Sequence, residues 1–281
     1  MTIIAFVGSV FSPYYAWARR QGKAVDPDNH CALNVALYSR EARRWTMTER
    51  GARHCHRDEM QFQIGPSQLR WQEDALVIDI DEWSVPWPHR VRGQVRLQAN
   101  TWFSESMALD AQGKHRWGPL APSARVSVSL EQPSQHWQGQ AYLDANEGDE
   151  PIEQACHEWD WSRALMADGS TAVIYDIQGK TSNEDRLLAL RFMTDGSVQP
   201  FVAPPRVNLP TTLWRMARRM RSDGSVQVKE TLEDTPFYQR ALLQSRLLGE
   251  SVQSFHETLS VPRLVSPWVQ AMLPWRMPRR A

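Results

Sequence analysis

The stretch that decides the fold is Arg90-Val91-Arg92-Gly93-Gln94-Val95-Arg96-Leu97. Its apolar side chains fall at positions 91, 95 and 97, and the arginines and the glutamine occupy the positions between them. Successive side chains of a strand point to opposite faces, so a period of two is typical of a strand with one buried face and one solvated face. The stretch therefore predicts an amphipathic β-strand.

The same alternation recurs in three other parts of the chain, at residues 124–130, 225–232 and 251–259. Glycine-containing turn sequences punctuate the chain, as at residues 110–113, 167–169, 194–196, 222–224 and 248–250. Many short strands separated by such turns indicate an antiparallel β-sandwich or β-barrel. Long helical periodicity is scarce, so the sequence predicts an all-β fold.

The length of the chain allows one large domain or two smaller ones, because 281 residues can bury a sizeable core in either arrangement. Proline-rich breaks offer candidate joints between domains. We expect the main joint at residues 117–122, where a Gly-Pro pair and a second proline occur. This joint predicts an N-terminal β-domain over residues 1–118 and a C-terminal β-domain over residues 119–281.

Composition excludes several classes of function. The formal net charge is zero, so a nucleic-acid partner is not expected, because such proteins need a basic surface. The cysteines Cys31, Cys55 and Cys156 have irregular spacing, and reduced thiols in a cytosolic protein are the simplest interpretation. No apolar run approaches the length of a membrane-spanning helix. The 13 tryptophans indicate either ordinary core packing or a wide apolar cavity with rigid walls.

The C-terminal segment differs in character from the rest. We expect a short helix over residues 266–273, with Ser266 as N-cap, Pro267 at the first helical position and Pro274 ending it. Two tryptophans and a methionine share one side of this segment, and three arginines follow. Two interpretations stay open, which are a terminal helix packed on the β-domain and an interfacial segment that contacts anionic lipid.

Common cofactor motifs are absent from the sequence. It contains no Gly-x-Gly-x-x-Gly, no phosphate-binding loop and no Gly-x-Ser-x-Gly elbow. His54-Cys55-His56 has the appearance of a metal-binding fragment, but a zinc site needs further well-placed ligands. We therefore expect no metal and no organic cofactor, and a solvated loop at residues 54–56.

Two pairs of residues in the middle of the chain carry groups that are suited to acid catalysis. His115 and Trp117 are spaced by two, and so are Tyr142 and Asp144. Such spacing places both side chains of a pair on one face of a strand. These residues can also be ordinary polar groups at strand ends. If the two strands share a cavity wall, that wall combines a carboxylic acid, an imidazole and two aromatic rings.

Several segments match one protein family in order and spacing over nearly the whole chain. They are Ser9–Trp17, Asn29–Tyr38, Met47–Gly51, Ala141–Asp144, Trp159–Arg163, Ser266–Gln270 and Arg276–Arg280. On these segments the sequence resembles the carotenoid 1,2-hydratases of phototrophic bacteria, also called hydroxyneurosporene synthases. The resemblance implies two lipocalin-like antiparallel β-barrel domains. It also implies addition of water across the terminal C1=C2 bond of acyclic carotenoids such as neurosporene and lycopene.

The resemblance also implies the catalytic residues, which are Asp144 as the acid with His115, Trp117 and Tyr142 around it. An aspartic acid must be protonated to act on an alkene, and burial among aromatic rings raises its pKa. We expect His115 to donate a hydrogen bond to Asp144 or to take a proton from water, and the rings of Trp117 and Tyr142 to stabilise a carbocation.

Two rival functions remain open on the sequence alone. One is a non-catalytic lipocalin-like carrier of carotenoid or lipid, and the other is a lipocalin-type pericyclase. For the hydratase we expect an acyclic carotenoid as substrate and a membrane surface as partner. The expected location is peripheral, on the cytoplasmic side of the inner photosynthetic membrane, because the substrate dissolves in lipid.

Overall fold

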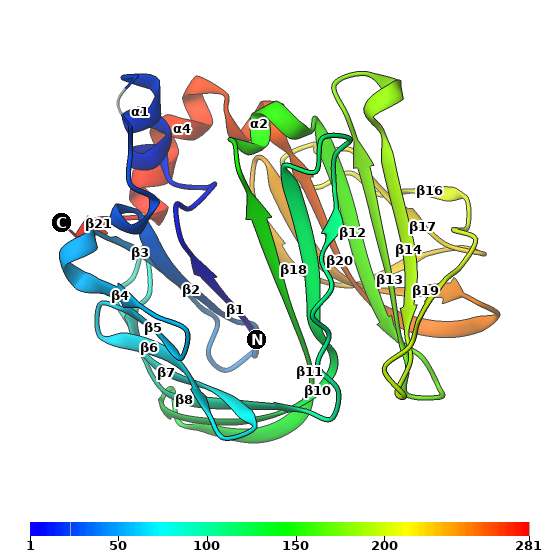
Figure 1. The fold of residues 1–281 in the computed structure, drawn as a ribbon, viewed down its shortest axis with the longest axis horizontal. Helices are drawn as coiled ribbons and strands as arrows, with labels where there is room; N and C mark the ends of the chain where they lie inside the picture. The colour runs from blue at the N-terminus through cyan, green and yellow to red at the C-terminus, as the bar shows by residue number, and fades with distance from the viewer. Residues whose placement is uncertain (23, 281) are drawn as a thin grey trace. The chain divides into compact units, whose positions relative to one another are not determined.

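The computed structural model describes residues 1–22 and 24–280. The chain divides into two compact units, each built from separate stretches. Unit 1 comprises Met1–Ala99, Ala124–Ala141 and Gln270–Ala281, and unit 2 comprises Asn100–Ser123 and Tyr142–Val269. Most of the regular structure in both units is antiparallel β-sheet (Figure 1). The predicted all-β class is therefore confirmed at this level.

Unit 1 holds a four-stranded sheet in the order β1-β2-β3-β21, together with the strands β8-β7-β6-β5-β4 of a second sheet. The strands are β1 (Thr2–Phe6), β2 (Cys31–Leu37), β3 (Arg44–Arg50), β4 (Cys55–Arg57), β5 (Gln61–Ile64), β6 (Ser67–Gln72), β7 (Ala75–Trp83), β8 (Arg90–Ala99) and β21 (Arg279–Arg280). Short 3₁₀ turns are η1 (Pro27–Asn29) and η2 (Ala52–His54).

The stretch at residues 90–97 forms most of β8 and has the predicted faces. Val91, Val95 and Leu97 are buried. Gly93 has a φ of +148°, and a Cβ there would lie 2.3 Å from the carbonyl oxygen of Ser129. Only glycine tolerates both conditions, so this residue permits β10 to approach β8 closely.

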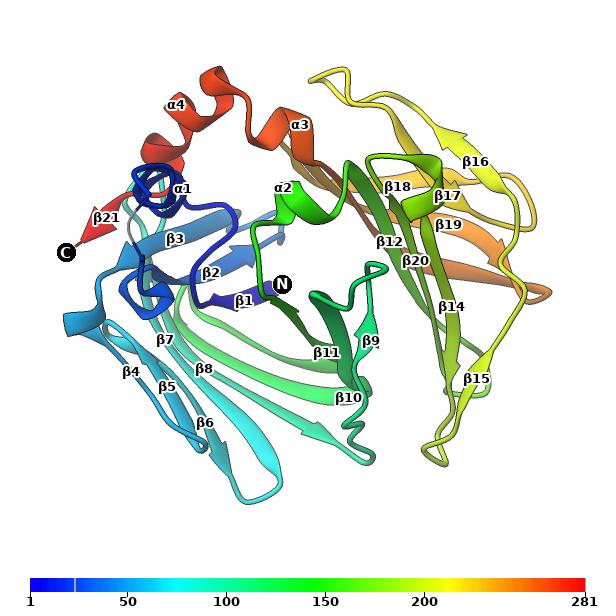
Figure 2. The ribbon, with the colours of Figure 1, turned by 45° about the horizontal axis from the view of Figure 1, so that its top comes forward.

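The C-terminal helix is longer than predicted. α4 runs from Pro267 to Arg276 and contains Pro274, which we expected to end it. The last turn persists because the amide of Met277 donates to the carbonyl of Leu273 at 2.8 Å and both side chains are buried. Two views place α4 beside α1 (Pro13–Arg20) in unit 1 (Figures 1 and 2). Nowhere in residues 1–22 and 24–280 does the structure contain a helix both long enough and apolar enough to cross a membrane.

Unit 2 is built on a seven-stranded sheet in the order β15-β14-β13-β12-β20-β19-β18. The strands are β12 (Glu158–Leu165), β13 (Thr171–Gln178), β14 (Arg186–Phe192), β15 (Val198–Pro200), β18 (Gln227–Asp234), β19 (Tyr238–Leu247) and β20 (Glu250–Ser260). Separate from this sheet are the hairpin of β16 (Arg206–Leu209) and β17 (Arg218–Arg221), the short strand β9 (Met107–Ala108), the 3₁₀ turn η3 (Ser182–Glu184) and the helices α2 (Ile152–Ala155) and α3 (Val261–Leu264). The predicted strands at 225–232 and 251–259 are confirmed as β18 and β20.

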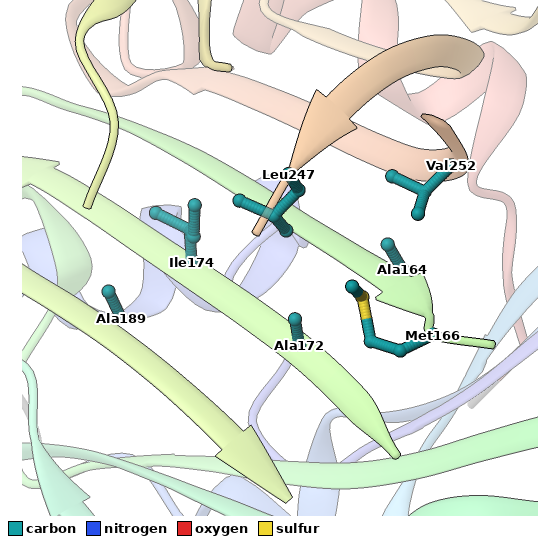
Figure 3. Packing of buried hydrophobic residues seen from close by; sticks show 7 residues of the cluster. All are labelled: Ala164, Met166, Ala172, Ile174, Ala189, Leu247 and Val252. Carbon is teal, nitrogen blue, oxygen red and sulfur yellow. The ribbon is translucent and has the colours of Figure 1, made fainter. Parts of the chain in front are cut away.

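One face of this sheet carries the apolar core of unit 2. Ala164, Ala172, Ile174 and Val252 pack there with other small and aliphatic side chains, as Figure 3 shows. Because strand residues alternate in direction, the neighbours of these residues point to the opposite face. That opposite face forms the candidate site described below.

Two long strands pass through both units. β10 (His115–Gln132) and β11 (Gln135–Gly148) each begin in one unit and end in the other. The joint expected at residues 117–122 lies inside β10, just before the chain leaves unit 2. A single boundary at 118/119 therefore differs from the observed division, because each unit needs residues from both sides of it. The strand orders are those of open sheets, so closure into barrels stays a prediction.

Candidate active site

Asp144 lies on β11, in the part of that strand that belongs to unit 2. Its Oδ2 accepts a hydrogen bond from Nε1 of Trp117 at 2.8 Å and another from the hydroxyl of Tyr142 at 3.2 Å. Tyr142 and Asp144 are two residues apart on one strand, so they share a face as predicted. Trp117 reaches the same carboxyl from β10. The structure therefore brings three of the four predicted site residues together.

The environment of Asp144 favours its neutral form. Burial raises the pKa of this carboxyl to about 6, because a desolvated carboxylate is disfavoured. The hydrogen bonds from Trp117 and Tyr142 and the charge of Arg163 lower the pKa, whereas the charge of Glu257 raises it. The net result is an acid that is partly protonated near neutral pH.

Trp117 has a different role from the one predicted. Its side chain is fully buried, with 0% exposure, and it packs edge-on against Tyr175 and Phe192 at centroid distances of 5.8 and 6.1 Å. Such a ring has no free face for a substrate cation, so the expected cation–π role of Trp117 is corrected. The indole acts as a rigid hydrogen-bond donor that holds Asp144.

The sheet face opposite the core of unit 2 supplies further aromatic rings. Trp161 of β12 lies 5.4 Å from Tyr142 at a tilt of 60°, and 6.4 Å from Phe255 of β20. Trp159, two residues before Trp161, contacts Tyr175 at 5.6 Å. The period-two tryptophans thus lie on the aromatic face near Asp144, and not in the core of Figure 3.

His115 does not join this cluster, which corrects the predicted hydrogen bond to Asp144. The amide of Asp149 donates to the carbonyl of Lys114 at 2.9 Å, and a Cβ on Gly148 would lie 2.8 Å from Nδ1 of His115. His115 therefore lies beside Gly148, four residues beyond Asp144 and about 13 Å along the strand. Its pKa is lowered, chiefly by burial, and its buried Nε2 has no hydrogen-bond partner among the described residues.

The comparisons with known proteins agree on one family. The family described as carotenoid hydratase CrtC matches residues 3–281. A protein of Rubrivivax gelatinosus named acyclic carotenoid 1,2-hydratase is 55% identical over 100% of this chain and 70% of its own length. The chain belongs to the carotenoid hydratase family.

Other members of the hydratase family show similar coverage. A protein of the same name from Thiocapsa roseopersicina is 50% identical over 99% of this chain and 69% of its own length. Another, from Rhodobacter capsulatus, is 36% identical over 99% of this chain and 98% of its own length. The predicted resemblance is thereby confirmed.

A solved structure shares the fold. A protein of Nitrosomonas europaea, described as a candidate AttH, has a TM-score of 0.58 over 82% of this chain and 85% of its own. The sequences are 13% identical, so this likeness concerns the fold alone.

Two charged residues near Asp144 were missed by the sequence analysis as site residues. Arg163 lies over the rings of Tyr142 and Phe255 at 5.1 and 5.2 Å, and Glu257 affects the pKa of Asp144. The signal for Glu257 was present in the sequence, because it alternates in phase with the apolar Phe255 and Leu259. A carboxylate on an otherwise apolar strand face has a specific partner or a specific function.

The His54-Cys55-His56 fragment lies in unit 1, at η2 and β4. Both histidines are exposed, and Nε2 of His56 lies 3.5 Å from Oδ2 of Asp58. They line a cavity of about 540 Å³ together with Arg50, Arg53 and Arg280. The fragment is thus in a solvated, basic part of unit 1, as predicted, but it forms the end of a 3₁₀ turn and the start of a strand, so the expected loop is corrected.

Proposed function

We propose that this chain is an acyclic carotenoid 1,2-hydratase in which Asp144 donates the proton that starts the reaction. The observation that carries the proposal is a carboxyl with a raised pKa, held by two hydrogen-bond donors and faced by aromatic rings. The names of the most similar relatives support the same reaction. Side chains and water are sufficient for it, so no cofactor is part of the proposal.

The first step needs a neutral carboxyl. Asp144 gives its proton to C2 of the alkene, the two π electrons form the new C2–H bond, and a tertiary cation remains at C1. With a pKa of about 6, about one-tenth of the carboxyl is protonated at pH 7, roughly a hundredfold more than for an unshifted aspartic acid. Burial of Asp144 thus supplies the reactive protonation state.

Trp117 and Tyr142 orient this proton. Both donate to Oδ2, so the acidic hydrogen of neutral Asp144 is placed on Oδ1. The two hydrogen bonds strengthen as the carboxylate forms, because charge-assisted bonds are about twice as strong as neutral ones. They therefore stabilise the transition state more than the ground state, which is the requirement for faster chemistry. This is the orienting role that the sequence analysis gave to His115.

The cation at C1 is stabilised by ring faces. Tyr142, Trp161 and Phe255 belong to one cluster of contacts. A cation over such a ring gains about 0.5–2 kcal/mol, with the larger values in dry sites. Arg163 already lies over Tyr142 and Phe255, and Trp161 is only 7% exposed, so the second face of the half-buried Tyr142 is the surface assigned to the substrate.

The central test is Asp144→Asn, assayed with detergent-solubilised lycopene in ¹⁸O-labelled water. The variant should lose ¹⁸O incorporation while keeping the circular dichroism spectrum and the carotenoid absorbance shift that reports binding. Retained hydration contradicts the acid assignment. Wild-type protein that binds lycopene without incorporating ¹⁸O would support a carrier instead, and a rearranged product without ¹⁸O would support a pericyclase.

We also propose that the protein docks peripherally on the cytoplasmic side of the membrane that dissolves its substrate. In unit 1, Trp17 of α1 and Trp275 of α4 are 64% and 75% exposed, and the two helices lie side by side (Figure 2). Arg20, the last residue of α1, and Arg276, the last residue of α4, are exposed as well. Exposed tryptophan next to basic side chains suits an anionic lipid surface.

Liposome co-sedimentation tests this docking. Trp17→Ala with Trp275→Ala should weaken sedimentation with vesicles that contain phosphatidylglycerol. Trp87→Ala is the matched control, since Trp87 is 74% exposed in unit 1 but lies outside both helices. If Trp87→Ala weakens sedimentation with the vesicles as much as the double variant does, the assignment of the docking surface is wrong.

A further inference from the structure

Hydration needs a base as well as an acid, because the water that attacks C1 must lose a proton. His115 was expected for this step, but it lies beside Gly148 and apart from Asp144. Two kinds of group are then left to take the proton, which are the carboxylate that Asp144 becomes in the first step and a second base nearby. The remaining ionisable groups that act on Asp144 from the opposing sheet are Glu257 and Arg163, and a guanidinium does not accept protons.

We propose that Glu257, which accepts a hydrogen bond from Arg240, is a second catalytic carboxylate of this site and takes the proton of the attacking water. The inference rests on the proposed function, in which Asp144 is the acid. It adds a residue that neither the sequence motifs nor the family resemblance identified.

The strand register places Glu257 on the correct face. Glu257 of β20 is directly opposite Trp161 of β12, which in turn is opposite Tyr175 of β13. Side chains directly opposite each other in an antiparallel pair lie on the same face, with Cβ atoms about 4.5–5.5 Å apart. Since Trp161 also contacts Tyr142, Glu257 lies on the aromatic face near Asp144.

The mutual electrostatic effects support this proximity. The charge of Glu257 raises the pKa of Asp144, and the charges of both carboxyls contribute to the raised pKa of Tyr175. Both carboxyls also act on the pKa of Arg163, which burial lowers. Three strands, β11, β12 and β20, thus direct an acid, a cation and a second carboxylate toward one space within unit 2.

Arg240 is the hydrogen-bond partner of Glu257. Nε of Arg240 donates to Oε1 of Glu257 at 2.7 Å, and the arginine side chain is 1% exposed. A buried arginine stays charged, so Glu257 has a fixed positive partner. The charge of Glu257 in turn raises the pKa of Asp144. The two carboxyls thus have different neighbours, an indole and a phenol for Asp144 and a guanidinium for Glu257, and such a difference in environment is the usual basis for separating acid and base roles.

Atoms and charges balance over the cycle. The O–H bond of Asp144 breaks and the C2–H bond forms. A lone pair of water then forms the C1–O bond while one O–H bond of that water breaks and its proton moves to Glu257. The product is the tertiary alcohol, and a proton passes through solvent from Glu257 back to Asp144. No oxidant or other co-reactant is needed.

Glu257→Gln tests the inference when lycopene is incubated in D₂O. Asp144 can still deliver a deuteron to C2, but the cation now returns to the alkene by losing the C2 proton, because water is no longer activated. Hydration should fall while deuterium enters the recovered lycopene. The ratio of deuterated substrate to hydrated product should rise about tenfold or more, since general base catalysis is worth about 10²–10⁴-fold.

Glu233→Gln is the matched control. Glu233 accepts from Nη1 of the same Arg240 at 2.9 Å, but it lies on β18, the edge strand of the sheet and two strands away from β20. Its ratio of exchange to hydration should match the wild type. Removing the charge of Glu257 should lower the pKa of Asp144, because that charge raises it. Each variant is therefore assayed at pH 5.5 as well as at pH 7, so that Asp144 is protonated in at least one assay.

The outcomes separate the two proposals. If exchange and hydration fall together in Glu257→Gln at both pH values, or if both are unchanged, Glu257 is not the base. If Asp144→Asn keeps exchange and hydration, the proposed acid itself is wrong. Circular dichroism and thermal unfolding of each variant show whether the fold is retained. In Glu257→Gln the new side chain offers Arg240 an amide oxygen in place of the carboxylate Oε1, so this contact can persist.

Discussion

Removing the indole hydrogen bond should move the pH profile of hydration upward. Trp117→Phe deletes the Nε1 donor, which lies 2.8 Å from Oδ2 of Asp144 and ranks first among the groups that lower the pKa of this carboxyl. The phenyl ring retains much of the packing against Tyr175 and Phe192. The substitution thus tests the hydrogen bond more than the apolar contact.

The size of the effect follows from the strength of the bond. A hydrogen bond to a charged group is worth about 1.5–3 kcal/mol, and one pKa unit corresponds to about 1.4 kcal/mol. The pKa of Asp144 should therefore rise from about 6 by about one to two pH units. The protonated form persists to higher pH, so the alkaline limb of kcat/KM shifts upward by the same amount. The maximal rate should fall, because the carboxyl is then a weaker acid.

The assay is the initial rate of lycopene hydration between pH 5 and 9, with thermal unfolding as a check on the fold. Tyr142→Phe removes the longer bond of 3.2 Å and should give a smaller shift in the same direction. An alkaline limb that stays in place, or moves to lower pH, in Trp117→Phe would refute the reasoning.

Two further predictions follow from the positions of other buried groups. His115→Gln should leave the alkaline limb of the profile in place, because His115 lies beside Gly148, about 13 Å along the strand from Asp144; a clear shift in the same pH-rate assay would show that His115 acts on Asp144. Asp160→Asn should change how the free energy of unfolding depends on pH, because burial raises the pKa of Asp160 to about 7. A raised pKa stabilises the fold at low pH, and this contribution is lost as pH rises from about 4 through 7, by on the order of 4 kcal/mol at most. Urea unfolding at several pH values should show a flatter profile in the variant, and an unchanged profile would count against a buried neutral Asp160. The neutral amide can keep the hydrogen bond that the hydroxyl of Thr258 gives to Oδ1.

Alternation predicted the strand at residues 90–97 well, because that strand has one buried face. The stretch at 251–259 also became a strand, although its two faces contact different parts of unit 2, the core at Val252 and the aromatic face at Phe255. The same rule correctly grouped Tyr142 with Asp144, since a spacing of two within one strand needs no knowledge of its partner. Local pattern was sufficient for these features.

The position of His115 depended on register, which local pattern does not contain. Counting straight back from the turn between Gln132 and Gln135 pairs Asp149 with Gly118, whereas the amide of Asp149 donates to the carbonyl of Lys114. The pairing therefore slips in the intervening stretch, where Pro119 and Pro122 lack the amide hydrogens that a regular ladder uses. For Glu257 the local pattern gave only part of the answer, since alternation placed it on one face with Phe255 and Leu259, whereas the pairing of β20 with β12 shows that this face is the aromatic one.

The path of β10 and β11 has a consequence for how such a protein can change over evolutionary time. Trp117 and Asp144 occupy the portions of these strands in unit 2, while the remainder of each strand completes unit 1. A gene fragment that ends anywhere between the codons for Trp117 and Asp144 encodes neither unit in full. Recombination can therefore not exchange one unit for that of another protein at a single crossover, and variation in substrate preference has to accumulate by point substitution within an intact chain.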